Sequence, residues 1–380
     1  MWLDDFVNKE LEQIKRNGLY RKRIILDNDV IDFSSNDYLG LKDNPETKEK
    51  IKTHLEKLSL GSGASTLISG YYQIQEQLEH EISKLKQTES SLVVGSGYIA
   101  NTGLIPALSD EDTMIFSDEY NHASIIDGIR LSKAKKEIYK HIDMQDLEDK
   151  LKKYKNVYKK IIITDGVFSM EGDIAPLKEI NFLAKKYGAV LIIDDAHGTG
   201  VMGEGRGTLY HFGLEPEDHI IQMGTLSKAV GSYGAFISAT KNVIDYLVNK
   251  MRTAIFTTGL SPLQNFVSLE HIKLIQKNKS RIKKLIENTE LLYQKMKENG
   301  IPVNYFGTPI LTVIIGDEWK TLKIRDKLLK ERLFVQGIRP PTVPKGSSRL
   351  RITVSTKHTE NDINLLLNKL KKVLDEEKNG

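Results

Sequence analysis

The chain has 380 residues, of which 39% are hydrophobic and 28% charged, and its formal net charge at pH 7 is +4. A chain of this length is expected to form two domains, because a single core stops growing near about 250 to 300 residues. The charge forms no long basic block, and no apolar run approaches the roughly 18 residues of a membrane span, so we expect neither a nucleic-acid partner nor a membrane partner. The absence of cysteine excludes disulfides, thiolate nucleophiles and cysteine-ligated metals, and no metal site is predicted. The acidic segment Met1–Asp5 is unlike a signal peptide, so we expect a cytoplasmic location.

The first 90 residues are predicted to contain more loops than regular structure. Apolar residues among charges predict a surface helix over residues 1–18, and Ile31–Phe33 alternates like a strand. Residues 34–41, with the sequence SSNDYLGL, have the composition of a turn. Residues 61–70 contain three glycines and four hydroxyl side chains, which fits either a loop near a ligand or a flexible surface loop. Helical spacing returns over residues 74–85.

Nearly continuous apolar runs alternate with helical patterns in the middle of the chain. The runs are residues 91–94, 113–116, 161–165 and 189–193, and a further run stops at Gly224. Continuous apolar runs are typical of strands that are covered on both faces. The predicted fold class is therefore α/β, with a mostly parallel central sheet and helices on both sides.

Polar side chains that could take part in catalysis or binding lie at or just after the ends of these strands. They are Asp165, Ser169, Asp194, His197, Thr225 and Lys228. Ligands of open α/β sheets bind beyond the carboxyl ends of the strands, so we expect these side chains to form a catalytic site there. Gly95 and Gly97, between a strand and the start of a helix, add an expected anion site, because free backbone N–H groups and the helix dipole meet at such a point.

Several common enzyme motifs are excluded. Residues 198–203 fit G-x-G-x-x-G after a strand, but a second loop follows where a dinucleotide site needs a helix, which disfavours a nicotinamide site. The patterns G-x-x-x-x-G-K-[ST], H-E-x-x-H and G-x-S-x-G are absent. Their absence disfavours P-loop NTPases, zincins and α/β-hydrolases.

The C-terminal part is predicted to be a small α+β domain. Its pattern predicts one long helix over residues 272–292, and then strands at 309–315 and 350–354 and helices at 322–333 and 363–374. We accordingly expect an N-terminal segment over residues 1–45, a large domain over 46–270 and a small domain over 271–380. Arg349 and Arg351 share one face of their strand, either as a fork for a carboxylate or as two solvated side chains.

Lys228 is the residue on which the functional interpretation depends. It follows Thr225 and Ser227 in a turn whose glycines allow other atoms to approach the backbone. A lysine in such a place forms a Schiff base when it is desolvated beside a cofactor, although the segment alone is better explained as a glycine-rich turn with one more solvated lysine. Combined with an aspartate after one strand, a histidine after another and a glycine turn at a helix start, it describes a pyridoxal phosphate site.

The chain resembles the α-oxoamine synthases, which are fold-type-I pyridoxal phosphate enzymes, over nearly its whole length. The matching segments are 34–41 (SSNDYLGL), 121–124 (NHAS), 165–170 (DGVFSM), 194–200 (DDAHGTG), 224–228 (GTLSK) and 338–344 (IRPPTVP). The resemblance implies a large cofactor-binding domain with a small α+β C-terminal domain. It also implies pyridoxal 5'-phosphate as the cofactor and a homodimer with shared active sites.

The resemblance further implies roles for single residues. Lys228 would form the Schiff base with the cofactor and act as general base, Asp194 would pair with the pyridine nitrogen, and His122 would stack on the ring. The other implied cofactor contacts are Ser169 and His197 at the phenolic oxygen, Gly97, Tyr98 and Thr225 at the phosphate, and Thr258 from a partner subunit. The implied substrate contacts are Arg351 at the amino-acid carboxylate, together with Arg21, Asn36 and Thr342.

The implied reaction is a decarboxylative condensation of L-alanine with pimeloyl-CoA, or with pimeloyl on acyl carrier protein. It would give 8-amino-7-oxononanoate, CoA and CO2 in biotin synthesis. Two alternatives stay open, namely the sister reaction of glycine with acetyl-CoA, as in glycine C-acetyltransferase, and an inactive binding module of the same fold. The sequence departs from the family pattern at three positions. Many relatives have arginine or glycine at the position of Thr66, relatives often have histidine at that of Gln75, and some have glutamate at that of Asp165.

Overall fold

The computed structural model describes residues 1–379, which form two compact units. The sheet unit consists of residues 36–169 and 173–284, and the terminal unit consists of residues 1–35, 170–172 and 285 onward. The domain limits predicted from the sequence, after residues 45 and 270, stay a prediction. None of the described helices has the length and apolar character that crossing a membrane requires.

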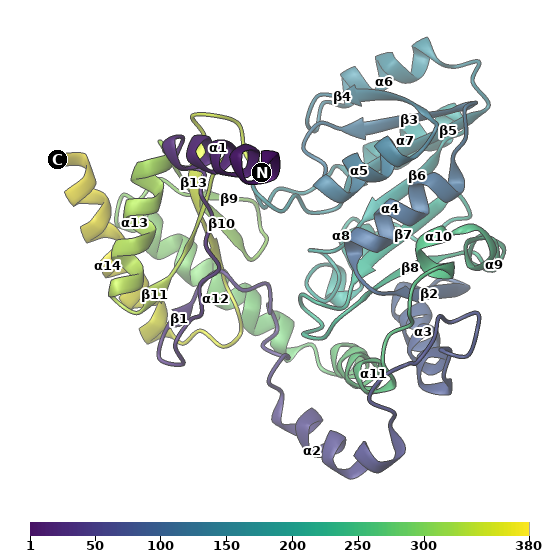
Figure 1. The fold of residues 1–380 in the computed structure, drawn as a ribbon, viewed down its shortest axis with the longest axis horizontal. Helices are drawn as coiled ribbons and strands as arrows, with labels where there is room; N and C mark the ends of the chain where they lie inside the picture. Colours follow the sequence, from purple (N-terminus) through teal and green to yellow (C-terminus); the bar gives the residue numbers. More distant parts are fainter. Residues whose placement is uncertain (380) are drawn as a thin grey trace. The chain divides into compact units, whose positions relative to one another are not determined.

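The sheet unit is built on seven strands in the order β2-β8-β7-β6-β5-β3-β4 (Figure 1). Their bounds are β2 Ser90–Val94, β3 Thr113–Asp118, β4 Lys135–Tyr139, β5 Lys159–Asp165, β6 Val190–Asp194, β7 Ile220–Thr225 and β8 Ala235–Ala239. Strands β4, β3, β5, β6 and β7 pair in parallel, whereas β8 pairs antiparallel with both β7 and β2.

Successive residues of the central strands face two separate apolar cores. In β5, Ile161 and Ile163 belong to one core and Ile162 to the other. The first core contains residues of α4 (Gly97–Leu108), α5 (Ala123–Leu131) and α9 (Lys241–Lys250), and the second contains residues of α6 (Met144–Lys153) and α7 (Leu177–Tyr187). Strands buried on both faces are rich in apolar residues that point alternately to the two sides, as Ile161, Ile162 and Ile163 do here. The predicted mostly parallel sheet with helices on both sides is confirmed.

The prediction of one long helix over residues 272–292 is wrong. The chain forms α11 (Pro262–Lys277) and α12 (Ser280–Glu298), which are separated at Asn278. The backbone of Asn278 is extended, with φ −125° and ψ 100°, and its Oδ1 accepts hydrogen bonds from the backbone N (2.9 Å) and Oγ (2.6 Å) of Ser280. A local asparagine cap therefore interrupts an apolar pattern that continues on both sides. The other helices of the sheet unit are α2 Pro45–His54, η1 Leu55–Lys57, α3 Gln73–Lys86, η2 Gly203–Gly205, α8 Thr208–His211 and α10 Arg252–Ile255.

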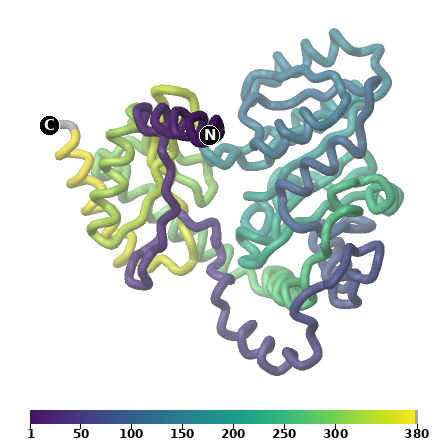
Figure 2. The backbone as a smooth tube through the Cα atoms, in the orientation of Figure 1, coloured from purple at the N-terminus to yellow at the C-terminus, as the bar shows by residue number. Residues whose placement is uncertain are grey.

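The terminal unit joins the two ends of the described chain, as the purple and yellow segments of Figure 2 show. Its antiparallel sheet has the order β12-β13-β10-β9, and a short parallel pair joins β1 to β11 through Ile31 and Leu333. The strands are β1 Ile31–Asp32, β9 Asn304–Tyr305, β10 Ile310–Gly316, β11 Leu333–Phe334, β12 Gln336–Ile338 and β13 Ser348–Thr353. Its helices are α1 Trp2–Arg16, residues 285–298 of α12, α13 Glu318–Lys330 and α14 Glu360–Asn379.

Candidate active site

A cavity of about 200 Å³ lies beyond the carboxyl ends of β5, β6 and β7 in the sheet unit. Its lining residues are Gly97, Tyr98, His122, Ser124, Asp165, Ser169, Asp194, Ala196, His197, Met223, Thr225, Ser227 and Lys228. All six polar residues that follow strands in the sequence are in this set. They meet because β5, β6 and β7 are parallel neighbours, with Asp165 paired to Asp194 and Asp194 to Met223.

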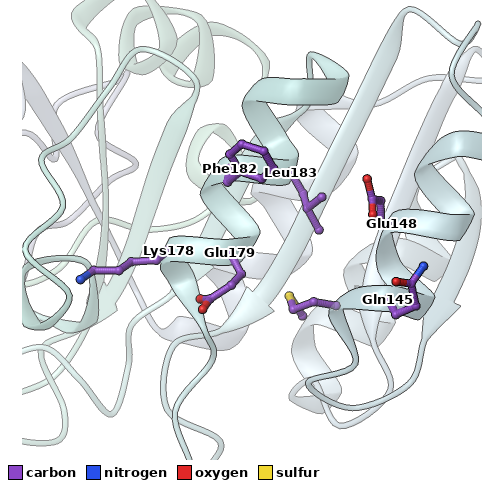
Figure 3. A pocket seen from close by; sticks show the side chains of 7 residues that line it. Gln145, Glu148, Lys178, Glu179, Phe182 and Leu183 are labelled. Carbon is purple, nitrogen blue, oxygen red and sulfur yellow. The ribbon is translucent and has the colours of Figure 1, made fainter.

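A second and larger cavity, of about 390 Å³, is a surface hollow between α6 and α7 (Figure 3). It is lined by Met144, Gln145, Glu148, Lys178, Glu179, Phe182 and Leu183. Glu148 is already paired with Lys186 at 2.7 Å, and none of the predicted site residues lies here. Size alone would select this hollow, so the assignment of the candidate active site to the smaller cavity depends on its converging polar groups.

Asp194 is held in a fixed orientation at the end of β6. It is buried, its Oδ1 accepts from the backbone N of Ala196 at 3.0 Å, and its Oδ2 accepts from Nδ2 of Asn101 at 2.7 Å. Nδ2 of Asn101 also donates to Oγ of Ser124 at 2.8 Å. Asn101 lies one helical turn after Gly97 in α4, so the helix whose first turn lines the cavity also orients the carboxylate.

A second carboxyl group, that of Asp165, lies at the end of β5. Burial raises the pKa of Asp165 well above its ordinary range, and the carboxylate of Asp194 raises it further. The backbone N of His122 donates to Oδ2 of Asp165 at 2.9 Å, which opposes the shift. The combined environment favours the protonated form of Asp165, because two buried carboxylates close together resist double ionisation.

His122 caps the N-terminus of α5 and lines the cavity. Its backbone and side chain are anchored, with Nδ1 2.8 Å from Oγ of Ser124. The ring is accessible from the open cavity, yet the protein around it displaces water and lowers the pKa of His122. The Asp194 carboxylate opposes that shift, and the Lys228 ammonium adds to it. A neutral imidazole ring is therefore favoured on this wall.

Lys228 lies in a tight turn between β7 and β8. The backbone N of Gly231 donates to the Lys228 carbonyl at 2.8 Å, and the backbone N of Ser232 donates to the Leu226 carbonyl at 2.8 Å. Gly231 has φ +65°, and a Cβ there would lie 2.5 Å from the backbone N of Lys42. The glycine thus allows the turn that carries Lys228 to pack directly on the segment that follows residues 34–41.

The start of α4 gives the cavity a group of donors that suits an anion. Gly97 and Tyr98 form the first turn of α4, whose N-terminal cap is the side chain of Ser96. Thr225 is close by on the lining, where its Oγ1 lies 2.7 Å from Oγ of Ser227. Backbone N–H groups at a helix start, together with hydroxyl donors, form a general phosphate site.

Five other predicted site residues, Asn36, Thr258, Arg21, Thr342 and Arg351, are not among the lining residues of this cavity. Asn36 accepts a hydrogen bond from the Tyr38 hydroxyl at 3.3 Å, and Thr258 is exposed in the loop that precedes α11. In the terminal unit, Arg21 and Thr342 line a separate cavity of about 280 Å³. Arg351 is buried and donates to Oγ1 of Thr353 at 2.8 Å.

Comparison with known proteins matches residues 28–370 to the family of class I and II aminotransferases. The 8-amino-7-oxononanoate synthase of Lysinibacillus sphaericus is 45% identical over 98% of this chain and 98% of its own length. The chain belongs to the 8-amino-7-oxononanoate synthase family.

Two solved structures are similar to it. Serine palmitoyltransferase from S. paucimobilis, with a bound PLP–myriocin aldimine, has a TM-score of 0.91 and 26% identity over 98% of this chain and 97% of its own. The 8-amino-7-oxononanoate synthase of Francisella tularensis has a TM-score of 0.80 and 29% identity over 93% and 100%.

Membership in the 8-amino-7-oxononanoate synthase family confirms three predictions: the α-oxoamine synthase resemblance, the fold-type-I class and pyridoxal phosphate as the cofactor. The residues of the cavity fit this cofactor. The lining combines two acidic side chains and one lysine with a helix N-terminus and hydroxyl groups. This donor set suits a molecule that has a cationic ring nitrogen and an anionic phosphate.

Two residues that the sequence did not indicate orient predicted site residues in this member of the 8-amino-7-oxononanoate synthase family. Asn101 holds Asp194, and the hydroxyl of Tyr38 lies 2.6 Å from Nδ1 of His197. These partners are 93 and 159 residues apart in the chain. Helical spacing from Gly97 could have indicated Asn101, whereas only the turn composition of residues 34–41 pointed to Tyr38.

Proposed function

We propose that the protein catalyses the condensation of L-alanine with a pimeloyl thioester, with loss of CO2, to give 8-amino-7-oxononanoate for biotin synthesis. The observation that carries the proposal is the convergence of Lys228, Asp194 and His122 on one cavity in a member of this family. The relatives' names support the product, and the acyl carrier, CoA or acyl carrier protein, is left to experiment.

Each polar residue of the cavity has a separate role in this reaction. Pyridoxal phosphate, when bound, supplies the electron sink that makes a carbanion at the amino-acid Cα accessible. Asp194 holds positive charge at the ring nitrogen, and at about 4 Å and an effective dielectric near 20 such a pair is worth roughly 4 kcal/mol. Lys228 Nζ removes the proton from Cα of alanine and returns one at the end, as a general base and acid. His122 covers one face of the ring, and Ser169 and His197 bind its phenolic oxygen.

The remaining roles concern the phosphate, the substrates and the assembly. Gly97, Tyr98 and Thr225 bind the phosphate, and the N-terminal end of α4 supports that role. Arg351 receives the alanine carboxylate, and Arg21, Asn36 and Thr342 contact the acyl substrate. We further propose a homodimer in the cytoplasm, in which Thr258 reaches the phosphate of the other subunit.

The decisive experiment compares amino acids and acyl donors on purified enzyme. We expect CO2 and free CoA from alanine with pimeloyl-CoA, and little turnover of glycine with acetyl-CoA. The opposite preference would replace this proposal by the glycine C-acetyltransferase activity. Borohydride reduction should fix the cofactor to Lys228, as detected by mass spectrometry of the peptide. Lys228→Ala should still bind cofactor but lose turnover by at least about 10²-fold, since general-base catalysis alone contributes 10² to 10⁴.

A further inference from the structure

A histidine outside the cavity bridges two carboxylates, one at the end of β3 and one in the loop after β5. His141 follows β4, and its Nδ1 lies 2.9 Å from Oδ1 of Asp118, while its Nε2 lies 2.7 Å from Oδ2 of Asp173. A neutral imidazole donates from only one nitrogen, so two carboxylate partners require the doubly protonated ring. We call His141, Asp118 and Asp173 the His141 clamp.

Two aromatic side chains and one backbone hydrogen bond hold the His141 ring in place. Tyr120 stacks on it at a centroid distance of 4.3 Å, and Phe168 meets it edge-on at 4.4 Å. Glu119 accepts from the backbone N of His141 at 2.9 Å. Asp118 is the last residue of β3, Glu119 and Tyr120 follow it in the loop before α5, and Phe168 and Asp173 belong to the loop after β5. The titratable groups that face His141 from the elements packed against it are therefore Asp118, Glu119, Tyr120 and Asp173.

The clamp is built at a cost in backbone strain. Ile142 has φ +56°, in the left-handed region that β-branched residues rarely adopt. Its backbone N donates to Oδ2 of Asp118 at 3.0 Å, so the strained turn aims residues 141 and 142 at that carboxylate. Such strain persists only where surrounding contacts determine it, and it concentrates at functional sites.

Both loops that the clamp joins carry residues of the cavity. Tyr120 is two residues before His122, and Phe168 immediately precedes Ser169. The loop after β5 is closed by hydrogen bonds from Phe168 N to the Asp173 carbonyl (2.9 Å) and from Ala175 N to the Gly166 carbonyl (3.0 Å), so a displacement of Asp173 is passed to Ser169. Oδ1 of Asp173 is buried without a hydrogen-bond partner among the described residues, which makes its carboxylate depend on His141.

We propose that the His141 clamp positions His122 and Ser169 against the bound pyridoxal phosphate, which makes His141 a positioning residue of this enzyme. This inference rests on the proposed function, which requires pyridoxal phosphate in the cavity. Hydrogen bonds to Asp118 and Asp173 raise the pKa of His141 to about 9 against the opposing effect of burial. The clamp is therefore charged at neutral pH and opens as the pH rises through about 9.

The test compares wild type with His141→Gln, and uses His219→Gln as the control. His219 lies 2.7 Å from Oδ1 of Asn181 and precedes β7, at the opposite edge of the sheet from the cavity. We expect His141→Gln to weaken pyridoxal phosphate binding, measured by fluorescence quenching at neutral pH, roughly tenfold, as the loss of one charge-assisted hydrogen bond implies. The affinity of His219→Gln for pyridoxal phosphate should stay within roughly twofold of wild type, since this half-buried histidine contacts none of the lining residues of the cavity. The advantage of wild type over His141→Gln should disappear as the pH rises through about 9.

Carbon-13 NMR of labelled histidine provides a second readout that does not need His141→Gln to fold, because the titration is followed in the wild type and Asp173→Asn serves only to assign the signal. The signal that Asp173→Asn perturbs should titrate near 9 rather than near the ordinary value of 6.5. Equal cofactor affinity of His141→Gln and wild type, or titration near 6.5, would overturn the proposal. Failure of the wild type itself to bind pyridoxal phosphate would instead refute the proposed function, and the NMR titration would still test the clamp.

Discussion

Two ion pairs brace loops at the cavity edge of the sheet, and they differ in burial. Lys86, from α3, is fully buried, and its Nζ lies 2.7 Å from Oδ2 of Asp195, next to the site residue Asp194. In the His141 clamp the histidine side chain keeps 15% of its surface exposed and joins two loops. Burial makes the first pair a condition for folding, because a lone buried charge is costly, whereas the second sets the geometry of the cavity.

The largest effect is expected from breaking the fully buried pair. Lys86→Met leaves Asp195 buried with only the Thr199 and Thr208 contacts, and should lower the free energy of unfolding by about 3 to 5 kcal/mol in a urea titration. Lys84→Met is the matched control, because Lys84 pairs with Glu81 on the exposed face of the same helix and should cost less than about 1 kcal/mol. Equal losses in the two variants would show that burial does not distinguish these pairs.

A smaller and pH-dependent effect is expected from the clamp. Because the pKa of His141 is about 9 in the folded protein and 6.5 when unperturbed, its stabilisation is fully present below about pH 6.5 and is lost as the pH rises through about 9. The difference in unfolding free energy between wild type and His141→Gln, on the order of 2 kcal/mol at neutral pH, should therefore decline across that window. A difference that stays constant between pH 6 and 10 would contradict the assigned charge.

The smallest effect is expected from the hydrogen bond between Tyr38 and His197, which lies in the loop after β6. Tyr38→Phe removes the hydroxyl that lies 2.6 Å from Nδ1 of His197 and should cost about 1 kcal/mol in stability. It should also slow turnover several-fold, because His197 lines the cavity. Tyr72→Phe, which loses a bond of 3.0 Å to the Ser62 carbonyl, should match the stability loss without the loss of turnover.

The comparison also shows what the sequence can reveal. Apolar runs predicted the strands because both faces of the sheet are covered, and polar residues after the strands were found because parallel strands end at one edge. The two braces were beyond sequence reasoning, since Lys86 is 109 residues from Asp195 and His141 is 32 residues from Asp173. Only the folded sheet brings such partners together. The break between α11 and α12 at Asn278 depends on side-chain hydrogen bonds, which the spacing of apolar residues does not reveal.

The antiparallel strand β8 has a consequence for synthesis on the ribosome. Strand β2 lies at the edge of the sheet and pairs only with β8 there, through residues such as Ser91 and Ser238, which are 147 residues apart in the chain. At 5 to 20 residues per second, β2 and the following turn at Gly97 wait roughly 7 to 30 s for their partner. A nascent chain that ends between residues 232 and 235 therefore has the lysine turn but lacks β8, the strand that joins β2 and the turn at Gly97 to the rest of the sheet.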